Sequence, residues 1–405
     1  MKKRGNTVKI CLLTFGKYPV PATEGGAVEN LIEMMAWDYQ SHQYQCSLDI
    51  ISKYSESAAK RAGNYDKVKF HFVSYSDTAQ KLSQLVRIFV HKLFGCAPAV
   101  IDPFFAKALK IIRKNKYDYV IVENGIYFVQ PLKKHCKSKV VLHLHNDFGT
   151  ISYHKPHVLI RNSDMMISVS DFVANTTRNT AECKFPVTTV KNVIDISAFS
   201  ANELLLCQAQ DIRHKYGFAQ DDVVCLFAGR LIPEKGIDFL IDAIAQQQND
   251  KIKLLVVGGS AFGDSQKTEF EQSLYDAAEK AGGRVVFAGY VDYKNMPAYY
   301  HSCDIAIFPS QCPDAAPLVA LEAQTAGKPV VASYAGGMPE YVCNESAIMV
   351  PMGSDFTSKL ADAINTLGAS PQLRERMGNA GIAFAAQHDK DGYFGRILDA
   401  VNDII

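Results

Sequence analysis

Short apolar runs alternate with longer amphipathic stretches along most of the 405 residues. Apolar runs bounded by turn residues predict buried strands, and apolar positions at helical spacing predict the helices between them. In the first half, the predicted strands are residues 8–15, 47–52, 67–74, 117–124, 138–147, 164–170 and 187–195. In the second half they are 223–230, 251–259, 284–290, 304–309 and 329–333. This alternation predicts an α/β protein with doubly wound parallel sheets.

Length and charge both indicate two domains. A chain of 405 residues is too long for one ordinary core. Residues 1–197 carry 27 Lys+Arg and 16 Asp+Glu, a net charge of +11, whereas the remainder carries 16 and 26, a net charge of −10. We therefore predict domains of residues 1–197 and 198–389, joined by a linker near 196–200.

A strand–loop–helix–strand unit at residues 304–333 carries two acids. Asp314 follows the strand, and Glu322 lies on the helix predicted for 318–326. Ligands of open α/β sheets bind at the carboxyl ends of strands, where a helix start favours an anion and a carboxylate can grip sugar hydroxyls. The unit is therefore consistent with a nucleotide-sugar site, and equally with an ordinary β-α-β unit that has two solvated acids.

Two further loops follow predicted strands. Arg230 and Lys235 could neutralise a diphosphate without a metal, or could be solvated loop charges. Gly25 and Gly26 precede a helix at 27–39, where they permit close approach to a ligand or simply form a flexible loop. A dinucleotide fingerprint at 256–263 fails, because Ser260 replaces its second glycine.

The sequence predicts no metal site and a reducing compartment. The one D-x-D spacing, Asp389–Asp391, lies in a late polar loop that we expect to be solvated. The ten cysteines form no C-x-x-C pair, which favours reduced thiols in the cytoplasm. No run of 18 apolar residues predicts a membrane span, and we interpret residues 1–15 as a short tip and a strand, not as a signal peptide.

The 304–333 unit resembles the signature of retaining glycosyltransferases of family 4, which have the GT-B fold. Residues 314–322 read D-A-A-P-L-V-A-L-E, where the family has Glu, seven residues and Glu, and A-Q-T-A-G-K-P-V-V follows. Asp314 replaces the first Glu, and Ala316-Pro317 replaces Phe-Gly. Residues 229–236 read G-R-L-x-x-E-K-G and match the family's donor-diphosphate motif. The loop at 256–263 and the block at 287–310 resemble two other segments of the family.

The resemblance implies two Rossmann-like domains facing across a cleft, an acceptor-binding one at 1–197 and a nucleotide-sugar-binding one at 198–389. A C-terminal helix at 390–405 would cross back onto the first. It also implies a metal-independent, retaining hexosyltransferase without a cofactor. The donor would be a nucleotide-diphosphate sugar, expected to be UDP-linked, and the acceptor a hydroxyl of a glycan or glycolipid precursor in cell-surface polysaccharide or glycoconjugate synthesis.

The resemblance also assigns site residues. Arg230 and Lys235 would hold the diphosphate, Glu322 the ribose and Asp314 the sugar hydroxyls. His145, at a strand end of the first domain, would act near the donor sugar, although an isolated histidine is more often structural; we expect His143 to be buried. The remaining implied donor contacts are Gly25, Gly26, Gly258, Tyr290, Val291, Leu318 and Val319, with Tyr290 and Val291 holding the base through their backbone groups.

Other functions stay open. A nucleotide-sugar 2-epimerase shares the fold class, but we cannot place its catalytic carboxylates and histidines. A non-catalytic nucleotide-sugar-binding subunit is favoured by Asp314 and by Pro317, which has no amide hydrogen to give a phosphate. The missing glycine pattern disfavours a dehydrogenase, and nothing indicates a nucleic acid as partner.

The region 81–116 suggests where a lipid-linked acceptor would lie. It holds eight cations and one acid, Asp102, interleaved with apolar residues. Such helices can lie on an anionic membrane surface. We therefore expect a cytoplasmic protein, peripheral on the inner face of the membrane; alternatively, the apolar residues are core and the cations a solvated face. The cations are Lys81, Arg87, Lys92, Lys107, Lys110, Arg113, Lys114 and Lys116.

Overall fold

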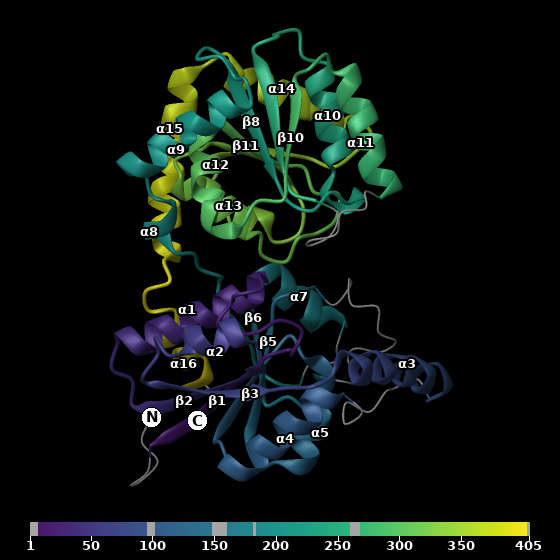
Figure 1. Cartoon of the computed structure of the whole chain (residues 1–405), viewed down its shortest axis with the longest axis vertical. Coiled ribbons are helices and arrows are strands. Elements are labelled where there is room, and N and C mark those ends of the chain that lie inside the picture. Colours follow the sequence, from purple (N-terminus) through teal and green to yellow (C-terminus); the bar gives the residue numbers. More distant parts are fainter. Residues whose placement is uncertain (1–6, 95–101, 148–159, 181–183, 260–267, 403–405) are drawn as a thin grey trace. The chain divides into compact units, whose positions relative to one another are not determined.

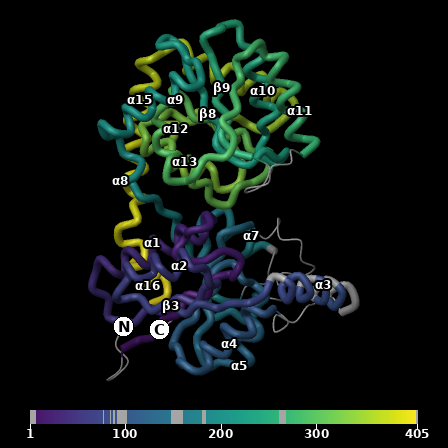
Figure 2. The backbone as a smooth tube through the Cα atoms, in the orientation of Figure 1, coloured from purple at the N-terminus to yellow at the C-terminus, as the bar shows by residue number. Residues whose placement is uncertain are grey.

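The computed structural model describes residues 7–94, 102–147, 160–180, 184–259 and 268–402. The chain divides into two compact units, which are Met1–Asn192 with Lys390–Ile405, and Val193–Asp389. The boundary expected from sequence, 197/198, lies a few residues inside the second unit. Figures 1 and 2 show a sheet with its own helices in each unit.

Within the described residues, seven parallel strands form the sheet of the first unit, in the order β3-β2-β1-β4-β5-β6-β7. Their side chains are largely buried because helices cover both faces, which explains the nearly unbroken apolar runs of the sequence. The strands are β1 (Val8–Leu13), β2 (Cys46–Lys53), β3 (Val68–Val73), β4 (Tyr119–Glu123), β5 (Lys139–Leu144), β6 (Met165–Ser168) and β7 (Val187–Thr189).

The helices of the first unit begin and end at recognisable signals. In α4, the Asp102 side chain accepts a hydrogen bond from the amide of Phe105 (3.0 Å), and Lys116 ends the helix in a left-handed conformation. The helices are α1 (Ala27–Ser41), α2 (Glu56–Ala62), α3 (Asp77–Phe94), α4 (Pro103–Asn115), α5 (Val129–His135), α7 (Asp171–Thr180) and α16 (Tyr393–Asn402).

The second unit has six parallel strands in its described residues, in the order β10-β9-β8-β11-β12-β13. Alternate residues of β8 serve two cores: Val224 and Leu226 face one, and Cys225 and Phe227 face the other. The strands are β8 (Val223–Ala228), β9 (Ile252–Val257), β10 (Val285–Gly289), β11 (Ile305–Phe308), β12 (Val330–Ser333) and β13 (Ala347–Val350). β13 was not expected from the sequence.

Helices cover both faces of this second sheet (Figure 1). Residues of α12 and α13 pack in one core cluster, and residues of α10 and α14 pack in the other. The helices are α8 (Ile196–Phe199), α9 (Glu203–Lys215), α10 (Ile237–Ala245), α11 (Glu269–Lys280), α12 (Met296–Ser302), α13 (Leu318–Thr325), α14 (Phe356–Gly368) and α15 (Pro371–Ala385).

The last helix, α16, packs against α1 in the first unit. Asp38 of α1 is fully buried and accepts hydrogen bonds from the amides of Gly392 (2.7 Å) and Phe394 (3.0 Å) at the start of α16. It also accepts one from the Tyr44 hydroxyl (2.6 Å). A buried carboxylate thus satisfies amides that a helix start leaves free.

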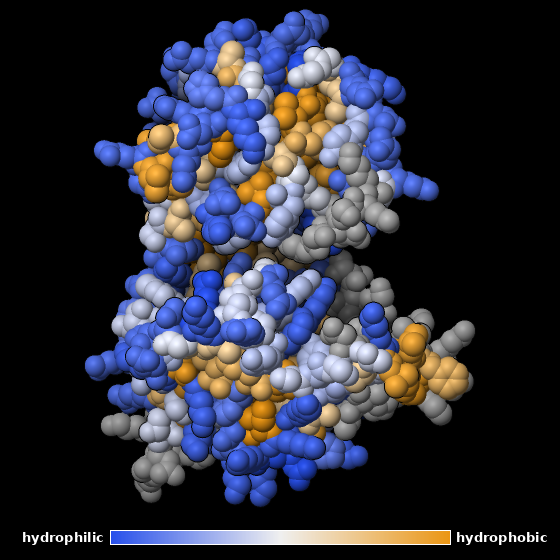
Figure 3. Space-filling view, viewed as in Figure 1, coloured by the Kyte–Doolittle hydropathy of each residue, from blue (hydrophilic) through white to orange (hydrophobic). Residues whose placement is uncertain are grey.

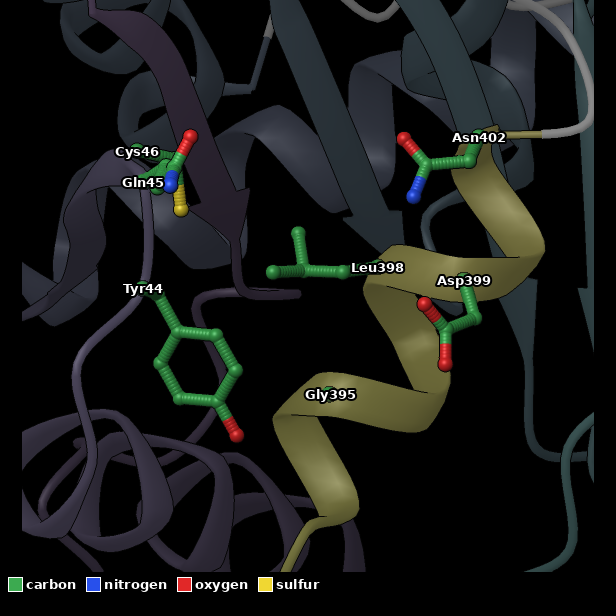
Figure 4. Close-up of a pocket in the computed structure, with 7 residues that line it drawn as sticks. All are labelled: Tyr44, Gln45, Cys46, Gly395, Leu398, Asp399 and Asn402. Atoms are coloured by element: carbon green, nitrogen blue, oxygen red, sulfur yellow. The ribbon is translucent and has the colours of Figure 1, made fainter. Parts of the chain in front are cut away.

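A small pocket of about 120 Å³ lies beside α16 (Figure 4). Because its lining includes Cys46, the first residue of β2, it lies toward the amino end of that strand. It is therefore not at the strand ends where ligands of such sheets bind. Its lining residues are Tyr44, Gln45, Cys46, Gly395, Leu398, Asp399 and Asn402.

Candidate functional site

The predicted donor residues of the second unit follow the carboxyl ends of β8 to β11, which are neighbours in the sheet. Their loops are in close contact. The amide of Gln311 donates to the carbonyl of Glu234 (2.8 Å), and a Cβ on Gly258, whose φ is 139°, would lie 1.8 Å from the carbonyl oxygen of Gly229. Only glycine at position 258 permits the loop after β9 to approach the loop after β8, so Gly258 shapes the site through its backbone.

Lys235 and Asp314 form an ion pair between the loops after β8 and β11, with 2.5 Å between Lys235 Nζ and Asp314 Oδ1. The Ser310 hydroxyl donates to the other carboxylate oxygen (2.8 Å). Both charged side chains are about one fifth to one quarter exposed, so each remains reachable by solvent. The structure thus brings together two predicted site residues that are 79 positions apart.

Arg230 is exposed and pairs with no acid among the described residues. It lies near the same loop, because the pKa of the Cys312 thiol, raised by burial, Asp314 and Glu234, is lowered by Lys235 and Arg230. The loops therefore hold two cations, Lys235 and Arg230, and two acids, Asp314 and Glu234, around Cys312.

Glu322 lies on α13 and is only 5% exposed. Tyr300 donates its hydroxyl hydrogen to Glu322 Oε2 (2.8 Å), and Tyr293 also hydrogen-bonds the carboxylate. Burial raises the pKa of Glu322 to about 7, although both tyrosines oppose the rise. Glu322 is therefore a buried acid with a raised pKa. It is not a solvated acid, as it would be in an ordinary β-α-β unit.

α13 begins at Leu318, the first residue of the helix expected from the sequence. Pro317 is the N-cap residue and makes no side-chain capping hydrogen bond. The amide of Ala320 donates to the carbonyl of Pro317 (3.1 Å). The amides of Leu318 and Val319 precede that bond, and both residues are half-buried. Tyr290 is 55% exposed and Val291 half-buried after β10.

In the first unit, Gly25 and Gly26 precede α1 with φ of 83° and 104°. His145 follows β5, and its Nε2 lies 2.7 Å from Glu123 Oε2 at the end of β4. His143, which is fully buried, has its Nδ1 3.0 Å from the same oxygen. The expectation that His143 is buried is confirmed, and His145 is part of a cluster, not an isolated side chain.

No role was expected from the sequence for Glu123, Ser310, Tyr293 and Tyr300. A signal for Glu123 exists: an acid ends one predicted strand and H-x-H ends the next, and neighbouring parallel strands bring such ends together. The tyrosines carry no such signal, because only packing directs their hydroxyl groups at Glu322.

Each unit carries its own predicted site, which is built on its own sheet. In the described residues, two groups could each converge on one cation: Glu123, His143 and His145, and Asp38, His42 and Asp391. Of the D-x-D pair, Asp391 is 60% exposed, whereas Asp389 accepts a hydrogen bond from the amide of Ile196 (3.3 Å).

Solved structures share the fold of this chain. Sucrose-phosphate synthase from Thermosynechococcus elongatus superimposes with a TM-score of 0.76 at 19% identity, covering 98% of this chain and 99% of that one. Anabaena HepE, solved in complex with UDP, gives 0.74 at 20% identity over 98% and 100%. The chain has the GT-B fold.

Sequence comparisons agree with this GT-B fold. Residues 208–384 match the family described as "Glycosyl transferases group 1". The lipopolysaccharide 1,2-N-acetylglucosaminetransferase of Salmonella typhimurium is 27% identical over 354 residues, which are 84% of each chain. The predicted GT-B architecture of two Rossmann-like domains is thus confirmed. No helix in the described part of the protein is long and apolar enough to cross a bilayer.

Proposed function

We propose that this GT-B protein is a retaining hexosyltransferase of family 4 that moves a sugar from a UDP-linked donor to a hydroxyl of a glycan or lipid-linked precursor. The observation that carries the proposal is the Lys235–Asp314 ion pair at the carboxyl ends of β8 and β11. It places a cation for a diphosphate beside an acid for sugar hydroxyls, as a nucleotide sugar requires.

The ion pair also indicates how a donor is received. A diphosphate carries more negative charge than one carboxylate, so it would draw Lys235 toward itself and also attract the exposed cation Arg230. Asp314 would then be free to accept hydrogen bonds from the sugar. The early amides of α13, at Leu318 and Val319, would add donors for the phosphates.

Glu322 is the proposed ribose ligand. An ionised carboxylate accepts hydrogen bonds from two vicinal hydroxyls, and the site already holds this group against Tyr300. Because burial raises its pKa to about 7, donor binding would be accompanied by proton release near neutral pH. This proton release separates the proposed role from that of a merely structural acid.

The proposed leaving-group chemistry is metal-independent. Two fixed cations stabilise the charge that grows on the diphosphate, and the donor phosphate itself takes the proton of the acceptor hydroxyl. His145 would act near the donor sugar. The names of the relatives, a lipopolysaccharide N-acetylglucosaminetransferase among them, support synthesis of cell-surface polysaccharide or glycoconjugate as the pathway.

The decisive experiment measures donor turnover in two charge-deletion variants. Arg230→Ala and Lys235→Ala should each lower turnover about 10²-fold or more, because fixed charge in such sites is worth several kcal/mol. The matched control is Lys251→Ala, which breaks an exposed Lys251–Asp221 ion pair (2.9 Å) in the same unit. Near-normal activity of both site variants would contradict the proposal.

The donor itself is found by thermal shift with a panel of nucleotide sugars. A ligand at 100 times its dissociation constant stabilises the folded protein by about 2.7 kcal/mol. UDP-linked sugars should give the largest shifts, and these shifts should be lost in Lys235→Ala but kept in Lys251→Ala.

A non-catalytic nucleotide-sugar-binding subunit is the second candidate, because Pro317 precedes α13 and offers no amide hydrogen to a phosphate. Hydrolysis of the donor in the absence of acceptor separates the two candidates. Binding of a nucleotide sugar with neither hydrolysis nor transfer would favour the binding subunit.

For the acceptor, we place the lipid-facing surface on α3. Leu82, Leu85, Val86 and Phe89 follow one another at helical spacing and are all exposed, with 62%, 65% and 64% exposure for Leu82, Leu85 and Phe89 (Figure 3). Exposed apolar stripes of this kind are uncommon on soluble surfaces and are suited to the interfacial layer of a bilayer.

The neighbouring helix α4 contributes only charge. Its apolar residues Phe104, Phe105, Leu109 and Ile112 are buried, so the expectation that they contact lipid is wrong: they form core. Its exposed cations are Lys107, Lys110, Arg113 and Lys114, followed by Lys116. The side chains of Arg87, Ile88, Lys92, Leu93 and Phe94, which belong to the same prediction, lie outside the described residues.

Flotation with liposomes tests this surface. The protein should float with vesicles that contain anionic lipid, less so as salt rises, and Leu85→Ser/Phe89→Ser should stay in the dense fraction. The control is Leu204→Ser/Leu206→Ser, which removes exposed apolar residues from α9 of the other unit. Absence of binding at low salt would favour a soluble acceptor.

A further inference from the structure

Three buried polar side chains converge at the carboxyl ends of β4 and β5. One oxygen of Glu123, Oε2, lies 2.7 Å from His145 Nε2 and 3.0 Å from His143 Nδ1. The side-chain exposures are 0% for Glu123, 0% for His143 and 3% for His145. Burying a carboxylate is costly, so the hydrogen bond with His145 and the close His143 nitrogen are a substantial compensation.

The backbone holds His145 at the same place. Asn124 adopts a left-handed conformation with φ of 59°, which turns the chain directly after β4. Its amide donates to the carbonyl of His143 (2.9 Å), and its Oδ1 accepts from the amide of His145 (2.8 Å). Glu123 and Asn124 thus fix the ring and the backbone of one histidine from consecutive positions.

The geometry restricts where the ring can carry its hydrogen. A nitrogen that faces a carboxylate at 2.7 Å has to donate, so Nε2 of His145 carries the hydrogen. A neutral imidazole has only one N–H group, which leaves Nδ1 as an acceptor. Nδ1 of His145 and Oε1 of Glu123 are both buried without a hydrogen-bond partner in the described residues.

The charges around the ring favour its neutral form. Burial lowers the pKa of His145 and nearby His143 lowers it further, against the opposing effect of Glu123. Burial raises the pKa of Glu123, but His143 and His145 outweigh this effect and lower it, so the carboxylate stays ionised. The other acid near this carboxylate is Glu29 of α1, whose pKa is raised by burial and by Glu123, and lowered by Lys17.

We infer that Glu123 is a positioning residue that holds His145 as a neutral imidazole with its hydrogen on Nε2 and an acceptor at Nδ1. The ligand class follows: an acceptor nitrogen takes a hydroxyl group, as of a sugar, and repels a phosphate oxygen. The inference deepens the proposed function, on which its catalytic meaning rests. Since Nδ1 is buried, binding has to expose it.

The test observes the ring nitrogens directly. The full-length protein is labelled with ¹⁵N-histidine, and the His145 signals are identified by their loss in His145→Gln. Wild-type protein should show a protonated Nε2 and an unprotonated Nδ1 from pH 6 to 8. Glu123→Gln, which keeps the shape of the side chain, should show a mixture of tautomers and at least a 10-fold lower kcat with little change in the KM of the donor.

A second variant separates charge from position. His143→Asn removes a neighbour that lowers the pKa of His145 but leaves Glu123 in place. The titration midpoint of His145 should therefore move up, whereas its tautomer should be retained. The matched control is Asp49→Asn, which breaks the His71–Asp49 pair (2.6 Å) between β2 and β3 of the same sheet. This variant should leave the His145 signals unchanged.

Three results for the ring nitrogens would overturn the inference. They are a doubly protonated His145 at pH 7, a hydrogen on Nδ1, and an unchanged tautomer in Glu123→Gln. Stoichiometric metal held by Glu123, His143 and His145, found by elemental analysis, would also overturn it, because a metal would then orient the ring. If the tautomer is as expected but His145→Gln keeps full activity, the inference on Glu123 stands and the proposed role of His145 fails.

Discussion

Replacing Glu322 with Gln should make this protein more stable at alkaline pH. Glu322 is 5% exposed and is held by the hydroxyl of Tyr300 at 2.8 Å. Burial raises its pKa from 4.5 to about 7. Glutamine keeps an oxygen that can accept the tyrosine hydrogen, but it never has to be ionised inside the protein.

The sign and size of the effect follow from proton binding. The native protein holds the Glu322 proton up to about pH 7, whereas the unfolded chain releases it near pH 4.5, so the free energy of unfolding falls as the pH rises between these values. The difference corresponds to about 3 kcal/mol above pH 7, since a tenfold change in proton affinity is worth about 1.4 kcal/mol. Glu322→Gln avoids this loss, and it should be nearly neutral below pH 4.5.

Thermal unfolding of wild type and Glu322→Gln between pH 4.5 and 8 measures the difference. For a unit of this size the gain at pH 8 should raise the Tm of the second unit by roughly 6 °C or more. Glu271→Gln is the control, because Glu271 is a carboxylate of similar exposure (8%) in the same unit. An equal Tm of both proteins at pH 8, or the same difference at every pH, would refute the reasoning.

The remaining predictions concern other parts of the chain. Asp38→Ala should lower the free energy of unfolding by about 3 kcal/mol or more, because buried Asp38 accepts hydrogen bonds from two amides at the start of α16 and from the Tyr44 hydroxyl. Limited proteolysis of this variant should release the C-terminal segment first, and an intact C-terminus would contradict the prediction. Asp314→Asn should lower turnover strongly, and Asp314→Glu should change the preferred donor sugar. Unchanged turnover and donor preference in Asp314→Ala would show that this acid only binds Lys235 and Ser310. Transfer should persist in excess EDTA, and loss of activity restored only by Mn²⁺ or Mg²⁺ would disprove the metal-independent mechanism.

Local pattern was enough to predict most strands and the doubly wound α/β sheets, and the resemblance to family 4 supplied the expectation of a GT-B fold. Each predicted strand is a short apolar run because both faces of a parallel sheet are covered, and turn residues mark where each run ends. β13, the run AIMV at Ala347–Val350, is a strand that was not predicted from the sequence. The order of the strands in each sheet decides which loops are neighbours. No single segment of the sequence specifies that order.

The sequence by itself determined which residue types stand at the strand ends, and the resemblance to family 4 gave them roles. Only the tertiary structure decided their partners. It joined Lys235 to Asp314 across two loops, and it surrounded Glu322 with Tyr293 and Tyr300. It also turned α3 outward and α4 inward, although both have the same mixture of cations and apolar residues. The physical reason is that pairing and burial depend on which faces meet after the sheets are assembled, and those contacts are non-local.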